Sequence, residues 1–270
     1  MNANWVLKKF HRTGVVIGVL HVPPLPGSAR SQAQIGRIWD TVHHEAKIYA
    51  THGVDALLLE NHGDAPFAKD AVEPHVPAIL GVFADRLHAA FKLPVGLNVL
   101  RNDARSAVAA ALAGGGSFVR VNVLSGVTAT DQGLIEGKAD EVQGYKKRLG
   151  FDVAILADAD VKFGTPLYRP SWPVLLKSLV QRALADAVIV TGEATGNAPE
   201  TAKLRAARAA IPETALLCGS GVTADNAPDI LPLCDGLIVG SAFKADGYVE
   251  NPVDFERVAT VMNNVRKVRG

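Results

Sequence analysis

The sequence predicts a single (β/α)8 barrel, a fold of roughly 250 residues that suits this chain of 270 residues. Short apolar runs alternate with longer segments whose apolar residues recur at helical spacing, and such alternation indicates a parallel sheet. Eight repeats with almost no remainder favour a closed barrel over an open doubly wound sheet. No Pro-, Gly- or Ser-rich linker divides the chain. We therefore expect residues 1–270 to form one domain, with 1–13 as an N-terminal extension that either caps the barrel or is mobile.

The predicted strands are nearly unbroken apolar runs, as expected of parallel strands that are buried on both faces. In chain order they span Val15–His21, Val54–Glu60, Val95–Val99, Phe118–Asn122, Val153–Ala157, Ala187–Thr191, Ala215–Cys218 and Gly236–Val239. The predicted helices span Ile35–Thr51, Pro77–Phe91, Asp103–Ala113, Ala139–Leu149, Trp172–Leu184, Glu200–Ala210, Ala224–Leu231 and Pro252–Val268. The loops after the first, second and fourth strands are long, and barrel active sites are built from loops on this face.

The composition excludes several classes of protein. A formal net charge of +1 gives no electrostatic footprint for nucleic acid. The apolar stretch Val15–Leu20 is too short for a transmembrane segment and is followed by His21 and two prolines. Cys218 and Cys234 are interpreted as free thiols in a reducing compartment. We therefore expect a cytoplasmic protein without a transmembrane segment or a nucleic-acid partner, and we expect a homo-oligomer.

Ionisable side chains gather where the predicted strands end, and buried charges in a barrel mouth are typical of functional sites. Glu60 directly follows an apolar run and can act there as a general acid or base, the alternative being an ion pair with Arg120. Asp158 is the second candidate for proton transfer. His21 and Lys162 are candidates for stabilising an oxyanion, and Lys162 could also form a Schiff base. The alternatives are a core histidine and a lysine paired with the neighbouring aspartates.

Further polar residues near the same strand ends are predicted to bind substrate hydroxyl groups. They are Asn98, Arg101, Arg120, Asn122 and Asp131. For Arg101 the alternative is that Asn102 or Asp103 begins the next helix as its N-cap and leaves Arg101 solvated. For Asp131 the alternative is a plain turn over residues 130–133.

Glycine-rich turns follow the last two predicted strands and predict a phosphate site. Bare backbone N–H groups in the loops after strands seven and eight of such barrels often bind an anion. The residues are Gly219, Ser220, Gly221, Gly240 and Ser241, with Gly192 and Gly196 of the sixth loop as helpers. Such turns also close strands where no ligand binds, which is the alternative.

Magnesium is the one candidate cofactor. If the residues after the fifth strand are extended, alternation places Asp158, Asp160 and Lys162 on one side. Together with Glu60, these aspartates offer the oxygen ligands that Mg²⁺ prefers. No spacing of His and Cys residues suggests zinc.

Long motifs recur through the chain: GVLHVPPLPGS at 18–28, ENHGDAPF at 60–67, GLNVLRND at 96–103, RVNV at 120–123, TDQG at 130–133 with IEG at 135–137, and GSGVT at 219–223. Together they resemble the BtpA/SgcQ family over nearly the whole chain. One departure is that the family tends to have a His after the fifth-strand Lys, where this chain has Phe163. No role of that His is therefore carried over.

The resemblance implies a ribulose-phosphate-binding type of barrel, which supports the phosphate interpretation of the last two turns. It implies less about chemistry. One branch of the family is named for photosystem I biogenesis and another lies beside sugar-phosphate genes, while members carry labels such as nucleoside triphosphatase or phosphoribosylanthranilate isomerase. We expect an enzyme that acts on a small phosphorylated sugar or nucleotide-derived substrate by isomerase, epimerase or lyase chemistry. The alternatives are a non-catalytic assembly or regulatory factor and a metal-dependent phosphohydrolase.

Overall fold

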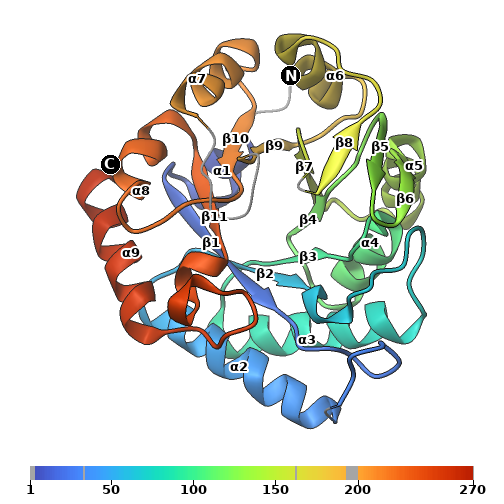
Figure 1. Ribbon diagram of the computed structural model, residues 1–270, viewed down its shortest axis with the longest axis vertical. Coiled ribbons are helices and arrows are strands. Elements are labelled where there is room, and N and C mark those ends of the chain that lie inside the picture. Colours follow the sequence, from blue (N-terminus) through green and yellow to red (C-terminus); the bar gives the residue numbers. More distant parts are fainter. Residues whose placement is uncertain (1–3, 33, 162, 193–199, 270) are drawn as a thin grey trace.

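The computed structural model describes residues 4–269 apart from 33, 162 and 193–199. Parallel strands close into a barrel in the order β1-β11-β10-β9-β7-β4-β3-β2, and helices surround it (Figure 1). The barrel strands are β1 (Val15–His21), β2 (Ala56–Glu60), β3 (Val95–Asn98), β4 (Phe118–Val121), β7 (Ala154–Asp158), β9 (Ala187–Val190), β10 (Ala215–Cys218) and β11 (Gly236–Val239). The predicted (β/α)8 barrel is confirmed.

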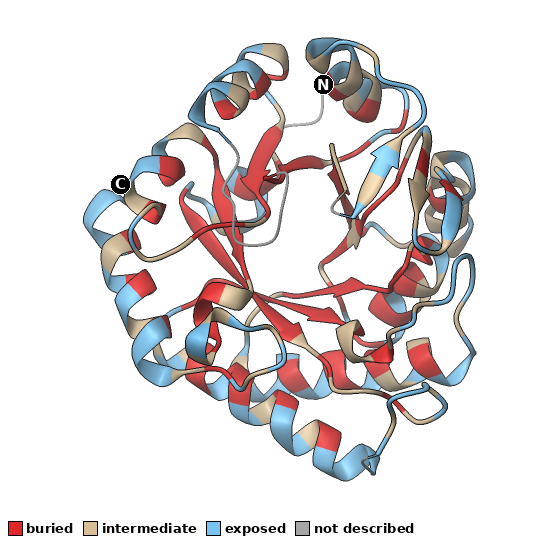
Figure 2. Ribbon diagram, viewed as in Figure 1, coloured by how far each residue is buried: buried red, intermediate tan, exposed pale blue. Residues whose placement is uncertain are grey.

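The outer helices follow the barrel strands in the expected alternation. They are α2 (Ile35–Thr51), α3 (His75–Phe91), α4 (Ala104–Ala113), α5 (Ala139–Leu149), α6 (Trp172–Gln181), α7 (Thr201–Ala210), α8 (Ala227–Ile230) and α9 (Phe255–Val268). Figure 2 shows why their sequences have helical periodicity, since each helix buries the face that packs on the strands and exposes the opposite face.

Alternation along each strand divides the apolar side chains between two cores. On β1, Val15, Ile17 and Val19 join the cluster inside the barrel, whereas Val16 and Leu20 pack in the layer between strands and helices. The other strands alternate in the same way. The side chain two positions beyond the last inward apolar residue therefore faces the mouth of the barrel.

A short N-terminal helix, α1 (Trp5–Phe10), was not among the predicted elements. The Asn4 side chain accepts hydrogen bonds from the backbone N–H groups of Val6 and Leu7 and so caps this helix. Trp5 and Val6 belong to the interior cluster, and the Trp5 ring meets Phe118 edge-on with 5.4 Å between centroids. Residues 4–10 therefore close the end of the barrel opposite the mouth.

A small antiparallel sheet beside the mouth is a second feature that the sequence pattern did not predict. Its strands are β5 (Val127–Thr130), β6 (Gly133–Glu136) and β8 (Gly164–Pro166), in the order β6-β5-β8. Two of these strands come from the long loop after β4 and the third from the loop after β7, so their pairing joins segments far apart in the chain. In Figure 1 the sheet lies between the barrel and the α5–α6 side of the helical ring.

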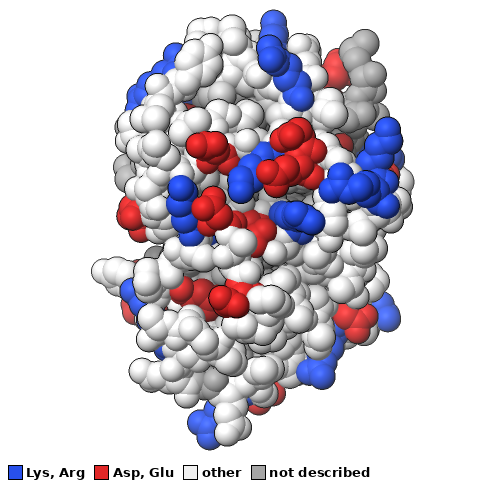
Figure 3. Space-filling view, turned by 90° about the vertical axis from the view of Figure 1, so that its right-hand side faces the viewer, with Lys and Arg blue, Asp and Glu red and all other residues white. Residues whose placement is uncertain are grey.

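Three surface and compositional features accompany this fold. Within the described part of the chain, no helix is both long enough and apolar enough to cross a membrane. Acidic and basic side chains are interspersed on the face shown in Figure 3. Cys218 and Cys234 are both buried free thiols.

Candidate functional site

Every second side chain of a barrel strand points into the barrel, and this alternation brings the predicted polar residues together at the mouth. Glu60 lies two positions beyond the inward Leu58, and Asp158 lies two positions beyond the inward Leu156. On the fourth strand, Phe118, Arg120 and then Asn122 are the inward-pointing positions. The period that fills the barrel with apolar groups thus also places its charged groups at the open end.

Arg120 and Asp158 form the centre of this cluster. Arg120 Nε donates to Asp158 Oδ2 at 3.3 Å, and Nη2 donates to both carboxylate oxygens at 3.2 Å. Asn122 Nδ2 donates to Asp158 Oδ2 at 2.8 Å. Asp158 is only 4% exposed, so it is held as a buried, multiply bonded carboxylate.

Burial and charge act against each other in this pair. Burial raises the pKa of Asp158, although Arg120 and Asn122 favour its charged form. Burial alone would lower the pKa of Arg120, but the carboxylates of Asp158 and Glu60 outweigh this and raise it. The guanidinium of Arg120 therefore stays charged, and its positive charge compensates the negative charges of Asp158 and Glu60.

Glu60 is held less tightly than Asp158. Asn98 Nδ2 donates to its Oε2 at 2.7 Å, and Arg120 Nη1 lies 4.0 Å from the same oxygen. No hydrogen bond from the described residues reaches Oε1. The ion pair with Arg120 and the acid/base role are therefore compatible, because Arg120 hydrogen-bonds to Asp158 rather than to Glu60.

For the loop after the third strand, the predicted N-cap is confirmed, but the expected solvent exposure of Arg101 is wrong. Asp103 Oδ1 accepts a hydrogen bond from the backbone N–H of Ser106 at 2.9 Å, so Asp103 caps α4. Arg101 is not solvated as that alternative supposed, since it is only 7% exposed. Burial lowers the pKa of Arg101, and nearby carboxylates, Asp131 foremost, oppose that shift. Arg101 is thus a second cation at the mouth.

Two buried polar residues that were not selected as site residues connect the mouth loops. Asn61 Oδ1 accepts from the backbone N–H of Leu100 at 2.7 Å, and Asn61 Nδ2 donates to Asp64 Oδ2 at 3.1 Å. Asp64 Oδ1 accepts from the backbone N–H of Leu25 at 2.8 Å. These bonds fix the loops after β1, β2 and β3 relative to one another, and the ENHGD motif was the sequence signal for them.

The two glycine turns predicted to bind phosphate lie side by side, because β10 and β11 are paired. Gly221 has a φ of +71°, which favours glycine. Ser241 and Ala242 begin a short 3₁₀ helix, and the first N–H groups of a helix have no acceptor within it. The Ser220 hydroxyl oxygen is buried and has no hydrogen-bond partner among the described residues. The turns therefore offer donors to an anion.

His21 connects this turn region with the acid/base cluster. It is paired in register with Glu60 on the neighbouring strand. On its other side, a Cβ added at Gly240 would lie 2.8 Å from His21 Cε1, so only glycine lets the imidazole lie against this turn. The His21 ring also meets His62 edge-on, with 5.1 Å between centroids.

The remaining predicted residues differ in what the structure describes of them. Lys162 and Gly196 lie outside the described residues. Asp131 lies at the exposed turn between β5 and β6, and from there its carboxylate acts on Arg101. Asp160 does not join Asp158 at Arg120 but accepts a hydrogen bond from Lys203 Nζ of α7 at 2.7 Å, because the extended run ends at Asp158.

The expected magnesium ligands therefore do not come together. Among the described residues there is no group of three His, Cys, Asp or Glu side chains arranged to hold a metal ion. A magnesium requirement stays a prediction.

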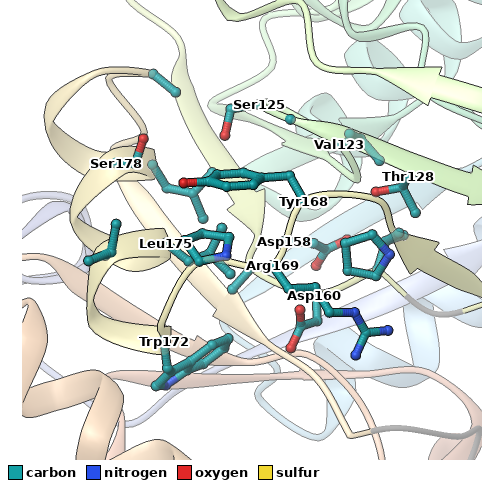
Figure 4. Close-up of a pocket in the computed structure, with 18 of the residues that line it drawn as sticks. Val123, Ser125, Thr128, Asp158, Asp160, Tyr168, Arg169, Trp172, Leu175 and Ser178 are labelled. Carbon is teal, nitrogen blue, oxygen red and sulfur yellow. The ribbon is translucent and has the colours of Figure 1, made fainter.

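A large cavity opens from the mouth towards the small sheet. Its volume is about 1190 Å³, and it lies between β5 and β8 on one side and α6 on the other (Figure 4). Asn122, Asp158 and Gly192 line its inner end. Asn122 is only 6% exposed, and its Oδ1 has no hydrogen-bond partner among the described residues. The cavity thus begins at a buried acceptor that a ligand could satisfy.

Solved structures of enzymes share this barrel. The N-(5′-phosphoribosyl)anthranilate isomerase of Pyrococcus furiosus aligns with a TM-score of 0.56 at 13% identity, covering 94% of this chain and 99% of that one. The YdjI aldolase of Escherichia coli K12 aligns with a TM-score of 0.51 at 12% identity, covering 97% and 91%. At such identities the likeness shows the fold alone.

Sequence relatives are much more similar. The photosystem I biogenesis protein BtpA of Synechocystis sp. is 42% identical over 94% of this chain and 88% of that protein. An uncharacterized protein of Pyrococcus furiosus is 38% identical over 94% of this chain and 96% of that protein. The family model described as the BtpA family matches residues 12–267. With the motifs at 18–28 and 60–67 now placed around one barrel mouth, the chain is assigned to the BtpA family.

Proposed function

We propose that this protein is an enzyme that catalyses proton transfer to and from carbon atoms of a small phosphorylated sugar or nucleotide-derived substrate, as isomerases, epimerases and lyases do. The observation that carries the proposal is the buried Glu60 beside Arg120, with one oxygen fixed by Asn98 and the other open to a ligand. A base next to a fixed cation is the arrangement that enolisation needs.

In this mechanism Glu60 removes the proton from the carbon next to a substrate carbonyl. The electron pair of that C–H bond forms a C=C bond, and the π electrons of the carbonyl group move to its oxygen, which gives an enediolate whose charge Arg120 and Arg101 stabilise. The hydroxyl proton of the enediolate passes to the oxygen of the former carbonyl, and the protonated Glu60 returns its proton to the former carbonyl carbon, which completes an isomerisation without any other reactant. Asp158 holds Arg120 in place through its three hydrogen bonds, so we assign it to positioning in addition to its candidacy for proton transfer.

The phosphate of the substrate is assigned to the turns after β10 and β11. The amides that begin the 3₁₀ helix at Ser241, the Ser220 hydroxyl and the imidazole of His21 would surround it. Because His21 is in register with Glu60, a phosphate at this place leaves the sugar carbons beside the base.

The related structures support the proposal through their fold only, since an isomerase and an aldolase use the same barrel. The name of the Synechocystis relative suggests an assembly role as the alternative. The charged cluster favours the enzyme, because a scaffold has no need of buried ionisable groups at an open mouth.

The test is solvent exchange. Purified protein is incubated in D₂O with pentose, pentulose and hexulose phosphates, with and without Mg²⁺, and loss of the substrate C–H signal is followed by proton NMR. Exchange at the carbon next to the carbonyl of one of these compounds is expected. Absence of exchange with all of them, together with a stable partner in affinity capture, would favour the assembly role.

Replacing Ser241 by glutamate is expected to abolish phosphate binding, because it adds a negative charge where the phosphate would lie. A ligand at about 100 times its Kd stabilises the folded state by about 2.7 kcal/mol, and this stabilisation should be lost. The measurement is a thermal shift with a sugar phosphate that stabilises the wild type. Ser171→Glu, outside these turns, is the matched control and should keep the shift. An undiminished shift for Ser241→Glu would place the phosphate elsewhere.

A further inference from the structure

The cavity beside the mouth is larger than a bare sugar phosphate needs. Its volume of about 1190 Å³ exceeds the roughly 300–1,000 Å³ of pockets that enclose drug-sized ligands. The phosphate turns after β10 and β11 lie outside it, because its inner end is formed by residues of β4, β7 and the β9 end. A sugar held at Glu60 with its phosphate on those turns would leave the cavity free for another part of the same molecule.

The walls of the cavity combine apolar surface with hydroxyl groups and charged side chains. Pro166, Leu175 and Trp172 supply apolar surface, while Ser125 and Thr128 supply hydroxyls. Such a lining suits a flat, rigid group with polar edges. The side chains come from the small sheet on one side and from α6 on the other, so their separation is set by tertiary packing (Figure 4).

Tyr168 is the side chain best placed to contact such a group. It is 71% exposed although it is aromatic, and Figure 4 shows its ring extending across the cavity. The backbone N–H of the preceding Leu167 donates to the carbonyl of Val127 at 2.9 Å, which continues the β5–β8 pairing and fixes the backbone just before Tyr168. A solvent-facing ring on a backbone held by strand pairing offers a stacking surface to another ring.

The cavity carries complementary polar groups. At the inner end, the buried Oδ1 of Asn122 is an acceptor without a partner among the described residues. Arg169 and Lys203 also line the cavity, and Lys203 is paired there with Asp160, which leaves Arg169 as a cation without an ion pair among the described residues. The acceptor suits a sugar hydroxyl, and the Arg169 guanidinium suits the electron-rich edge of a heterocycle.

We infer that the substrate is a sugar phosphate that keeps a free carbonyl and carries a planar, nitrogen-containing ring, and that the ring stacks on Tyr168 in this cavity. Nucleoside monophosphates, whose N-glycosidic bond blocks the sugar carbonyl, are non-reacting probes of this ring site. This inference rests on the proposed function for the place of the sugar and its phosphate. It narrows the proposed substrate class, phosphorylated sugars and nucleotide-derived compounds, to sugar phosphates that carry such a ring.

The test compares ligands by isothermal titration calorimetry. The probes are AMP, GMP and UMP, together with ribose 5-phosphate, which lacks the ring, and adenosine, which lacks the phosphate. At least one monophosphate is expected to bind the wild type about tenfold more tightly than ribose 5-phosphate, because base stacking on an aromatic side chain supplies this order of affinity. Tyr168→Ala should remove this advantage, and Tyr168→Phe, which keeps the ring, should retain it. Tyr248→Ala, an exposed tyrosine outside the cavity, is the matched control.

The outcomes separate the two proposals. Equal affinities for ribose 5-phosphate and every monophosphate, or an advantage that survives in Tyr168→Ala, would overturn the ring site and leave the proposed function standing. Adenosine binding that depends on Tyr168, without any binding of ribose 5-phosphate, would support the ring site and overturn the phosphate part of the proposed function. No binding of any probe would overturn the ring site, while the proposed function would still be decided by the proton-exchange test with pentulose and hexulose phosphates.

Discussion

Glu60→Gln is expected to lower the rate of substrate proton exchange by about 10²–10⁴-fold, the range that general acid–base groups contribute. Glutamine has nearly the same shape, and its oxygen can still accept the hydrogen bond that Asn98 donates to Glu60 Oε2 at 2.7 Å. It cannot take up a proton from carbon at neutral pH. The exchange rate in D₂O, measured by proton NMR at saturating substrate, is therefore the readout, and the affinity for substrate should change far less.

The control for this variant is Glu213→Gln, an exposed carboxylate just before β10 and so at the closed end of the barrel. It should exchange protons at the wild-type rate. Both variants should unfold at the wild-type temperature, which shows that the fold is intact. Full exchange activity in a folded Glu60→Gln protein would remove Glu60 from the mechanism and direct attention to Asp158.

Arg120→Leu is expected to lower the free energy of unfolding by about 3–5 kcal/mol, the cost of removing one partner from a buried ion pair. It leaves the Asp158 carboxylate, which is only 4% exposed, without its guanidinium. The loss should be measured by urea unfolding at neutral pH. An exposed ion pair would contribute only about 0–1 kcal/mol, so the size of the effect distinguishes a dry cluster from a hydrated one.

The sign of the pH dependence provides a second check on Arg120→Leu. Burial raises the pKa of Asp158 and Arg120 opposes that shift, so removing Arg120 should raise this pKa further above its value in the unfolded chain. A folded state that holds the proton more tightly loses stability as the pH rises between the two pKa values. The deficit of the variant should therefore be larger near pH 7 than near pH 4.

The double variant Arg120→Leu/Asp158→Leu is the control for charge imbalance. Replacing both members of a buried pair by apolar groups is often nearly neutral, so the double variant should recover much of the lost stability. A double variant as unstable as Arg120→Leu alone would mean that the packing of Arg120, and not its charge, stabilises the mouth.

The barrel could be predicted from the sequence because each strand carries its own signal. Runs such as Ala56–Leu59 are buried on both faces and are therefore apolar throughout, and their spacing repeats along the chain. The small sheet could not be found in this way. Its three strands have at most four residues each, and β5 pairs with β8 from a loop more than 30 positions further along the chain. The local signal for β5 and β6 was the β-branched run ending in Thr130, followed by Gly133.

For the candidate site, the sequence predicted which residues lie at the mouth but not which of them contact one another. His21, Glu60, Asn98, Arg120, Asn122 and Asp158 all stand at strand ends, and alternation counted from the apolar residues of each strand places them in the mouth. Which of them pair was not predictable, because the partners come from different strands. The bonds of Asp158 to Arg120 and Asn122 depend on β4 and β7 being neighbours in register.

The sequence by itself determined the fold, the family and the set of polar residues at the mouth, since these depend on patterns that repeat within short segments. Only the tertiary structure decided that Arg101 is buried, that Asp160 turns away to Lys203, and that Tyr168 faces a cavity between the small sheet and α6. The physical reason is that burial and cavity shape are set by what the rest of the chain places against a residue. Such contacts produce no repeating pattern in the sequence around the residue.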